Sequence, residues 1–127
     1  MTSKHLAAGL LGGVFMSLCI SAAARAADPQ AGARVFNQCK ACHALEAGTN
    51  KVGPSLHGLF GRTAGTVDGF KYSDAMKGSG LVWDEEALHT YLSNPRGAVP
   101  GTKMVFPGIK NPQQLDDLVA YLKEATK

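Results

Sequence analysis

The chain has 127 residues, of which 45% are hydrophobic and 18% charged, and its formal net charge is +3. A chain of this length forms one small domain with a limited hydrophobic core. Two of the 13 basic residues, Lys4 and Arg25, lie in an N-terminal segment that we expect to be removed, which lowers the net charge to +1. This near balance excludes a strong overall positive field and gives no indication of a nucleic-acid partner.

Residues 1–26 have the features of a cleaved secretory signal peptide. Lys4 precedes an uncharged run over residues 6–20, and Ala24-Arg25-Ala26 follows as a small-x-small cleavage site. The alternative is a retained membrane anchor, but the run has 15 residues, whereas a transmembrane helix needs about 20. We therefore expect cleavage after Ala26, or one or two residues away, and a mature chain of residues 27–127 in the periplasm.

Three segments of the mature chain carry the capping residues of short helices. The predicted helices begin at Asp28-Pro29, Asp84 and Asn111-Pro112, because Asp and Asn side chains accept backbone N–H bonds and proline suits the first turn. Asn94-Pro95 is expected to end the second helix, and residues 73–77 to form one further turn. The predicted fold class is therefore all-α, with three main short helices. Apolar residues follow the caps at helical spacing: Ala31, Val35, Phe36 and Cys39 in the first helix, Leu88, Tyr91 and Leu92 in the second, and Leu115, Leu118, Val119 and Leu122 in the third.

The middle of the chain, over residues 47–69, has neither helical nor strand periodicity. A loop of about 20 residues inside so small a domain is unusual unless it packs against something other than protein. We expect this loop to wrap around a bound group.

That group is indicated by Cys39-Lys40-Ala41-Cys42-His43, the motif of c-type haem attachment. Each cysteine can add to one vinyl group of the porphyrin as a thioether, and the histidine then lies under the iron as an axial ligand. The alternatives are a disulfide, a redox-active thiol pair and a zinc site. A redox pair usually follows a β-strand, whereas residues 28–38 are predicted to be helical, and zinc usually needs a second Cys-x-x-Cys. We therefore expect one haem c per chain, attached through Cys39 and Cys42.

Met104 is the best candidate for the second axial ligand, on the other face of the haem. It ends the segment over residues 100–104, in which a rigid proline and a small glycine let the backbone approach a flat group. A thioether ligand favours Fe(II) and raises the reduction potential. Met76 is the rival, although a methionine in a helical turn usually fills the core. His57 is expected to make a structural hydrogen bond to backbone, and His89 to be solvated on the polar side of its helix.

Many further residues match one family in order along residues 30–126. Besides the haem motif they are Gly32, Phe36, the segments 53–62 and 69–75, Trp83, Tyr91-Leu92, the segment 100–104 and the segment 118–126. In these residues the chain resembles class I cytochromes c, close to mitochondrial cytochrome c and the bacterial cytochromes c2. The resemblance implies the cytochrome c fold and a monomeric one-electron carrier, not an enzyme, cycling between Fe(II) and Fe(III). It implies as partners a quinol-oxidising cytochrome bc1 complex and either a terminal oxidase or a photosynthetic reaction centre.

The resemblance also implies roles for individual residues around the haem. Pro54 would accept a hydrogen bond from the ring N–H of His43, which fixes the tautomer and makes the imidazole a better donor. Arg62, Tyr72 and Trp83 would surround a buried haem propionate and offset its desolvation.

On the other face, Tyr91 would point its hydroxyl at the Met104 sulfur, and Thr102 would lie near the second propionate. Gly32 would permit a close crossing of the terminal helices, with Phe36 packed on the last helix.

Two departures from the family pattern bear on function. Met76 stands where the family usually has asparagine, so we expect apolar packing in place of a polar network beside the haem. The docking face carries fewer lysines than in mitochondrial members, so steering toward an acidic partner should be weaker and less sensitive to salt. The candidates for a positive ring around the haem edge are Lys51, Lys71, Arg96, Lys103 and Lys110.

Two other classes of function stay open at the level of sequence. One is a haem enzyme or gas sensor in which Met104 leaves the iron, although no distal His or Arg near Met104 would activate a bound ligand. The other is a haem-free adaptor or thiol protein.

Overall fold

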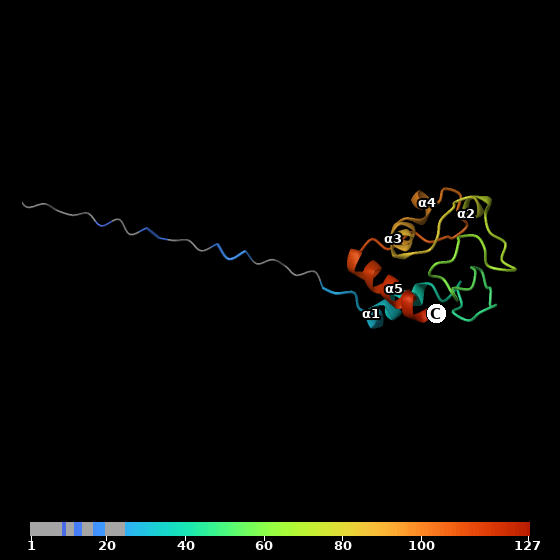
Figure 1. The fold of residues 1–127 in the computed structure, drawn as a ribbon, viewed down its shortest axis with the longest axis horizontal. Helices are drawn as coiled ribbons and strands as arrows, with labels where there is room; N and C mark the ends of the chain where they lie inside the picture. The colour runs from blue at the N-terminus through green and yellow to red at the C-terminus, as the bar shows by residue number, and fades with distance from the viewer. Residues whose placement is uncertain (1–8, 10–11, 14–16, 20–24) are drawn as a thin grey trace, which may run out of the picture.

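The computed structural model describes residues 9, 12–13, 17–19 and 25–127, so most of the predicted signal peptide lies outside the described residues. The helices of the described chain confirm the all-α prediction (Figure 1), and the one β pairing found there is an isolated bridge between Thr63 and Val82. No helix in this described part is long and apolar enough to cross a membrane. In chain order the elements are α1 (Pro29–Val35), the 3-10 helix η1 (Phe36–Gln38), α2 (Asp74–Lys77), α3 (Glu85–Ser93), α4 (Pro95–Ala98) and α5 (Pro112–Ala125).

The capping residues begin the helices as predicted. The side chains of Asp28, Asp84 and Asn111 accept hydrogen bonds from main-chain N–H groups in the first turns of α1, α3 and α5. Ser73 caps α2 in the same way, which confirms the further turn. The helix α4 was not predicted: Asn94 ends α3 and also caps α4 by accepting from the Gly97 N–H at 3.2 Å.

The first and last helices, α1 and α5, cross at close range (Figure 1), and Gly32 makes this crossing possible. A Cβ atom at Gly32 would lie 1.9 Å from the carbonyl oxygen of Asp117 and 2.7 Å from Cβ of Tyr121. Beside it, the Phe36 ring packs on the Tyr121 ring with centroids 5.2 Å apart. Phe36 and Leu118 are among the most buried side chains, at 1% and 0% exposure. The close crossing implied by the family resemblance is therefore present.

The middle segment, over residues 47–69, contains no helix or strand, as predicted. Hydrogen bonds with side chains fix its course instead. Ser55 donates to the Glu46 carbonyl at 2.6 Å, and Asn50 accepts from the Ser55 N–H at 2.9 Å while donating to the Asp68 carbonyl at 3.0 Å. This loop passes directly beside the haem motif, which positions the residues described next.

Candidate haem site

The residues of the haem motif lie on one tight turn at the end of η1. The main-chain N–H of Cys39 donates to the Phe36 carbonyl at 2.8 Å. The N–H groups of Cys42 and His43 then both donate to the Cys39 carbonyl, at 3.2 and 2.9 Å. Two thiols and an imidazole on a single turn can all engage one macrocycle.

The environment of Cys39 is unlike that of the reactive thiol in a redox-active pair. Cys39 and Cys42 are free and partly buried. Burial, with a smaller contribution from Cys42, raises the pKa of Cys39 to about 11. Reactive pairs instead lower a thiol pKa, often at a helix N-terminus, whereas Cys39 caps the C-terminal end of η1, where the helix dipole disfavours a thiolate. The structure therefore disfavours the thiol-redox alternative.

A single hydrogen bond orients the His43 imidazole. Its Nδ1 lies 2.7 Å from the Pro54 carbonyl oxygen, and because a carbonyl can only accept, Nδ1 carries the proton and Nε2 keeps a free lone pair. Burial lowers the pKa of His43; the Pro54 bond opposes this shift, and the charges of Arg62 and Lys51 add to it. The ring is therefore neutral at neutral pH, which is the form that binds a metal.

Gly53 completes this side of the site, although it was not among the predicted site residues. A Cβ atom there would lie 2.4 Å from Cε1 of His43 and 2.8 Å from both ring nitrogens, so the missing side chain lets the backbone lie against the imidazole. Its main-chain N–H donates to the Cys42 carbonyl at 2.8 Å, which ties the loop to the motif. The Gly53-Pro54 pair was a usable sequence signal, because glycine permits such close backbone approaches.

Arg62 and Trp83 are joined through the main chain, since the Trp83 N–H donates to the Arg62 carbonyl at 2.9 Å. Burial lowers the pKa of Arg62, and nearby Tyr72 opposes this effect. The Arg62 Nη1 donates to the carbonyls of Ser55 and His57 at 3.2 and 2.9 Å, whereas its Nε is buried without a hydrogen-bond partner in the part of the chain that the structure describes. A buried cationic donor without an acceptor is costly, so this atom fits an acidic group of a ligand, such as a haem propionate.

Farther along the chain, Tyr91, Thr102 and Met104 form a linked group. The Tyr91 hydroxyl shares a hydrogen bond of 2.7 Å with Thr102 Oγ1, which also accepts from the Met104 N–H at 3.4 Å. The expectation that Tyr91 points its hydroxyl at the Met104 sulfur stays a prediction, because a hydroxyl that accepts from Thr102 can still donate to sulfur. Thr102 in turn holds the main chain of Met104.

The two candidate methionines lie in different surroundings. Met76 is 8% exposed and belongs to the hydrophobic core, as expected for a residue that fills space. Met104 is only partly buried and lies on an irregular segment after α4. His57 is exposed and engages its surroundings through its main chain, accepting from Arg62 and donating to Ser55, so the expected side-chain bond is corrected to main-chain ones.

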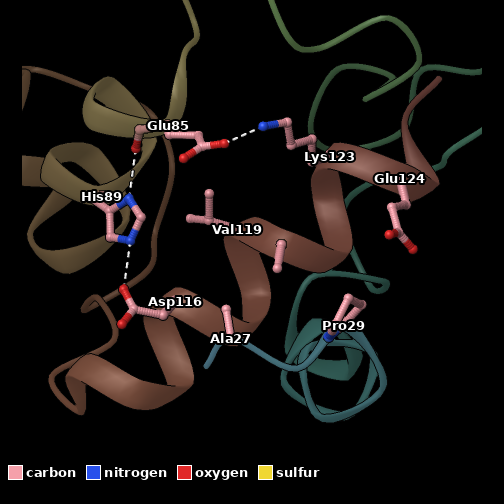
Figure 2. A pocket seen from close by; sticks show the side chains of 9 residues that line it. Ala27, Pro29, Glu85, His89, Asp116, Val119, Lys123 and Glu124 are labelled. Atoms are coloured by element: carbon pink, nitrogen blue, oxygen red, sulfur yellow. Dashed lines mark hydrogen bonds and ion pairs between the residues drawn. The ribbon is translucent and has the colours of Figure 1, made fainter. Parts of the chain in front are cut away.

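His89 is not simply solvated, which corrects its prediction. Figure 2 shows it linking α3 to α5: Nδ1 lies 2.7 Å from the Glu85 carbonyl and Nε2 lies 2.7 Å from Asp116 Oδ1. Partial burial opposes the shift, but these two bonds and the acidic neighbours raise the pKa of His89. Lys123 pairs with the Glu85 carboxylate beside it. This cluster lies between the helices and has no part in the haem motif.

Comparison with known proteins identifies the family. The sequence model of the family described as cytochrome c matches residues 29–126. The chain belongs to the cytochrome c family. A cytochrome c2 of Blastochloris viridis is 48% identical over 116 residues, 91% of each chain. A cytochrome c2 of Rhodoplanes tepidamans is 55% identical over 98 residues, 76% of this chain and 92% of the relative. The solved structure of cytochrome cH from Methylobacterium extorquens superposes with a TM-score of 0.71 at 52% identity, covering 76% of this chain and 97% of the other.

This chain is thus a class I cytochrome c, close to the bacterial cytochromes c2, and has the all-α cytochrome c fold. Proteins of this family hold a covalent haem c through cysteine and carry electrons rather than catalyse a reaction, and Cys39 and Cys42 occupy the attachment motif here. The residues present fit that group. They supply two thiols on one turn, a neutral imidazole with a free Nε2, and a buried guanidinium nitrogen of Arg62 that has no partner among the described residues.

Proposed function

We propose that this cytochrome c transfers single electrons in the periplasm between a quinol-oxidising cytochrome bc1 complex and either a terminal oxidase or a photosynthetic reaction centre. When bound, the haem supplies a one-electron Fe(II)/Fe(III) couple. Cys39 and Cys42 would attach it, and His43 and Met104 would bind its iron. The two cytochrome c2 relatives support redox partners of this kind.

The observation that carries the proposal is the 2.7 Å bond between His43 Nδ1 and the Pro54 carbonyl. It fixes the ring orientation and leaves Nε2 as the donor atom. Met104 offers a neutral, soft sulfur on a segment that Thr102 and Tyr91 hold in place. If His43 and Met104 bind the iron in both oxidation states, little would have to rearrange on electron transfer, and the iron would keep no open site for a substrate or a gas.

Four residues serve the propionates in this proposal. Arg62, Tyr72 and Trp83 act on one propionate, and the unpartnered Nε of Arg62 supports this role most directly. Thr102 would serve the second, and its hydroxyl shares a hydrogen bond with Tyr91. Charged and hydroxyl donors in place before binding offset the desolvation of a buried carboxylate.

Two measurements on the purified protein test the proposal. After denaturing electrophoresis, haem stain should remain on the polypeptide, and the oxidised visible spectrum should show a sulfur-to-iron charge-transfer band. Loss of the stain would contradict covalent attachment. A high-spin, five-coordinate spectrum would contradict the carrier and favour a haem enzyme or sensor. Turnover with isolated oxidases and reaction centres, combined with a redox titration, then identifies the partner.

Docking is proposed to use the positive side chains around the haem edge, all of which are exposed: Lys51, Lys71, Arg96, Lys103 and Lys110. Three of these ammonium groups rest on carbonyls, Lys51 on that of Lys40, Lys103 on that of Lys71 and Lys110 on that of Ser93. Lys103→Gln should slow association with a partner complex several-fold at low salt and little at high salt, because salt screens exposed charges. Lys123→Gln, which removes a positive charge on α5, serves as the control and should not slow association.

Cleavage after Ala26 is proposed to deliver residues 27–127 to the periplasm. The intact mass of the secreted holoprotein tests this directly. A mass that includes residues 1–26 would contradict removal of the signal peptide and favour a retained anchor.

A further inference from the structure

Asp117 is a buried carboxylate at the crossing of α1 and α5. It is 2% exposed, and the close approach of Gly32 to its carbonyl fixes where it lies. A carboxylate taken out of water stays ionised only if hydrogen bonds and a cation compensate its lost hydration. The ionisation of Asp117 therefore depends on the groups that contact its carboxylate.

Three groups meet the Asp117 carboxylate. The main-chain N–H of Asp28 and the Gln113 side chain donate to Oδ1 at 2.8 and 3.0 Å, and the Arg25 guanidinium donates to Oδ2 at 2.9 Å. The Asp28 N–H is the main cause of a lowered pKa of Asp117; burial opposes it, and Gln113 and Arg25 add to it. Arg25 is the one cation among these three partners.

Arg25 precedes the proposed cleavage site, so processing after Ala26 removes this cation from Asp117. The same cleavage creates a new cation, the ammonium of Ala27. Its nitrogen is three covalent bonds from the Asp28 nitrogen, which already donates to Asp117. Rotation about one backbone bond of Ala27 therefore turns the ammonium toward the oxygen that Arg25 leaves.

We propose that the mature N-terminus is a structural binding group: the Ala27 ammonium replaces Arg25 on Asp117 and ties the start of α1 to α5. This proposal rests on the proposed cleavage after Ala26. The other charged groups near Ala27 line the hollow in Figure 2, namely Glu85 and His89 on α3 and Asp116, Lys123 and Glu124 on α5. Four of these groups form two pairs, Asp116 with His89 and Lys123 with Glu85, and the Asp28 carboxylate accepts from the Gln30 N–H at 2.9 Å. Among the carboxylates around Ala27, Asp117 is therefore the buried one that loses its cation on processing, whereas Glu124 is exposed to water.

The first test titrates the α-amine of the mature holoprotein by competitive acylation, with the lysines as internal reference and mass spectrometry as readout. In wild type we expect the Ala27 amine to titrate about one unit above its ordinary pKa of about 7.7–8.0, the lower end of the effect of a close opposite charge. Asp117→Asn should restore the ordinary value and roughly five- to tenfold faster acylation near pH 7.5. Glu86→Gln, which removes an exposed carboxylate on α3, should leave the amine as in wild type. Equal titration in all three proteins would overturn the proposal.

The second test needs no change at Asp117 and covers the case in which Asp117→Asn does not fold. A Gly-Ser extension before Ala27 moves the ammonium away from the carboxylate. A raised amine pKa gives stability that is complete below the unfolded value near 8 and is lost as pH rises through the folded value. Urea unfolding of the wild-type holoprotein should show this loss between about pH 8 and pH 10, and the extended chain should lack it.

Identical pH profiles for the two chains would overturn the proposal, as would an intact mass showing that the secreted chain keeps Arg25. Failure of the electron-carrier function shows separately, as an absent charge-transfer band. That failure leaves the acylation and unfolding comparisons unaffected, so the two proposals can fail independently.

Discussion

Gly53→Ala places a methyl group against the imidazole of His43. The new Cβ would lie 2.4 Å from Cε1 and 2.8 Å from Nδ1 and Nε2, whereas carbon atoms in ordinary contact are about 3.5–4.0 Å apart. Gly53 is not one of the glycines with positive φ, so the alanine backbone itself is not strained. The clash is therefore with the ring, and either the ring or the loop has to move by about 1 Å.

The expected loss in the free energy of unfolding has two parts. A movement of about 1 Å takes the bond between His43 Nδ1 and the Pro54 carbonyl, now 2.7 Å, out of hydrogen-bonding geometry. Its loss costs about 0.5–1.5 kcal/mol, and overpacking adds about 1–3 kcal/mol. We expect a loss of roughly 2–4 kcal/mol, which lowers the Tm by at least about 8 °C in a domain of this size. The imidazole also becomes a weaker donor, which raises the reduction potential.

Thermal unfolding and redox titration of the holoprotein measure both effects. Gly78→Ala is the matched control, because a Cβ at this helix end has its nearest neighbour, the Asp74 carbonyl, at 3.3 Å. The reasoning is refuted if Gly53→Ala unfolds at the same temperature as Gly78→Ala and keeps the wild-type potential. That result would mean that the loop adjusts without disturbing His43.

Three further predictions concern the second ligand, the helix crossing and pH. Met104→Ala should abolish the charge-transfer band. Met76→Ala should keep the band and lower the free energy of unfolding by about 2–5 kcal/mol. The reverse pattern in visible spectra and urea unfolding would refute the ligand assignment. Gly32→Ala should lower the urea concentration at the unfolding midpoint. A Cβ 1.9 Å from a backbone oxygen costs about 1–3 kcal/mol or more, which outweighs the gain in helix propensity of about 1 kcal/mol. A raised midpoint would contradict this prediction. The raised pKa of His89 implies stability that is complete below about pH 6.5 and is lost as pH rises through the folded value. The stability difference between wild type and His89→Gln should therefore shrink from pH 5 to pH 8, and a growing difference would show that the sign is wrong.

Helix starts could be predicted because a cap is a local interaction. The side chains of Asp84 and Asn111 each accept from an N–H three residues later, so both partners of the hydrogen bond lie in one short stretch of the sequence. The helix α4 was missed although its cap is just as local. It has four residues, too few to show a period, and the Asn94-Pro95 pair that begins it was interpreted only as the end of α3.

The residues of the site also fall into some that could be predicted from the sequence and some that could not. The haem motif is specified by its spacing, and the bond between His43 and Pro54 was implied by the family resemblance. The bonds of Tyr91 to Thr102 and of His89 to Asp116 were not predicted, because the tertiary fold brings several polar neighbours within hydrogen-bond distance of each side chain. Thr102 lies 11 positions from Tyr91 and Asp116 lies 27 positions from His89. Such choices depend on differences of an ångström that residue spacing does not encode.

The two candidate axial ligands are supported by different kinds of atoms, and this determines how each can be altered. His43 is held by main chain, through the Pro54 carbonyl and the bare backbone of Gly53, so substitutions act on it chiefly by adding bulk. Met104 is held through the hydroxyls of Thr102 and Tyr91, which single substitutions can remove without crowding the site. Since hydrogen bonds near a ligand tune a redox centre, changes of potential with little change of fold should come from the Met104 side. Changes at the His43 side should alter stability and potential together.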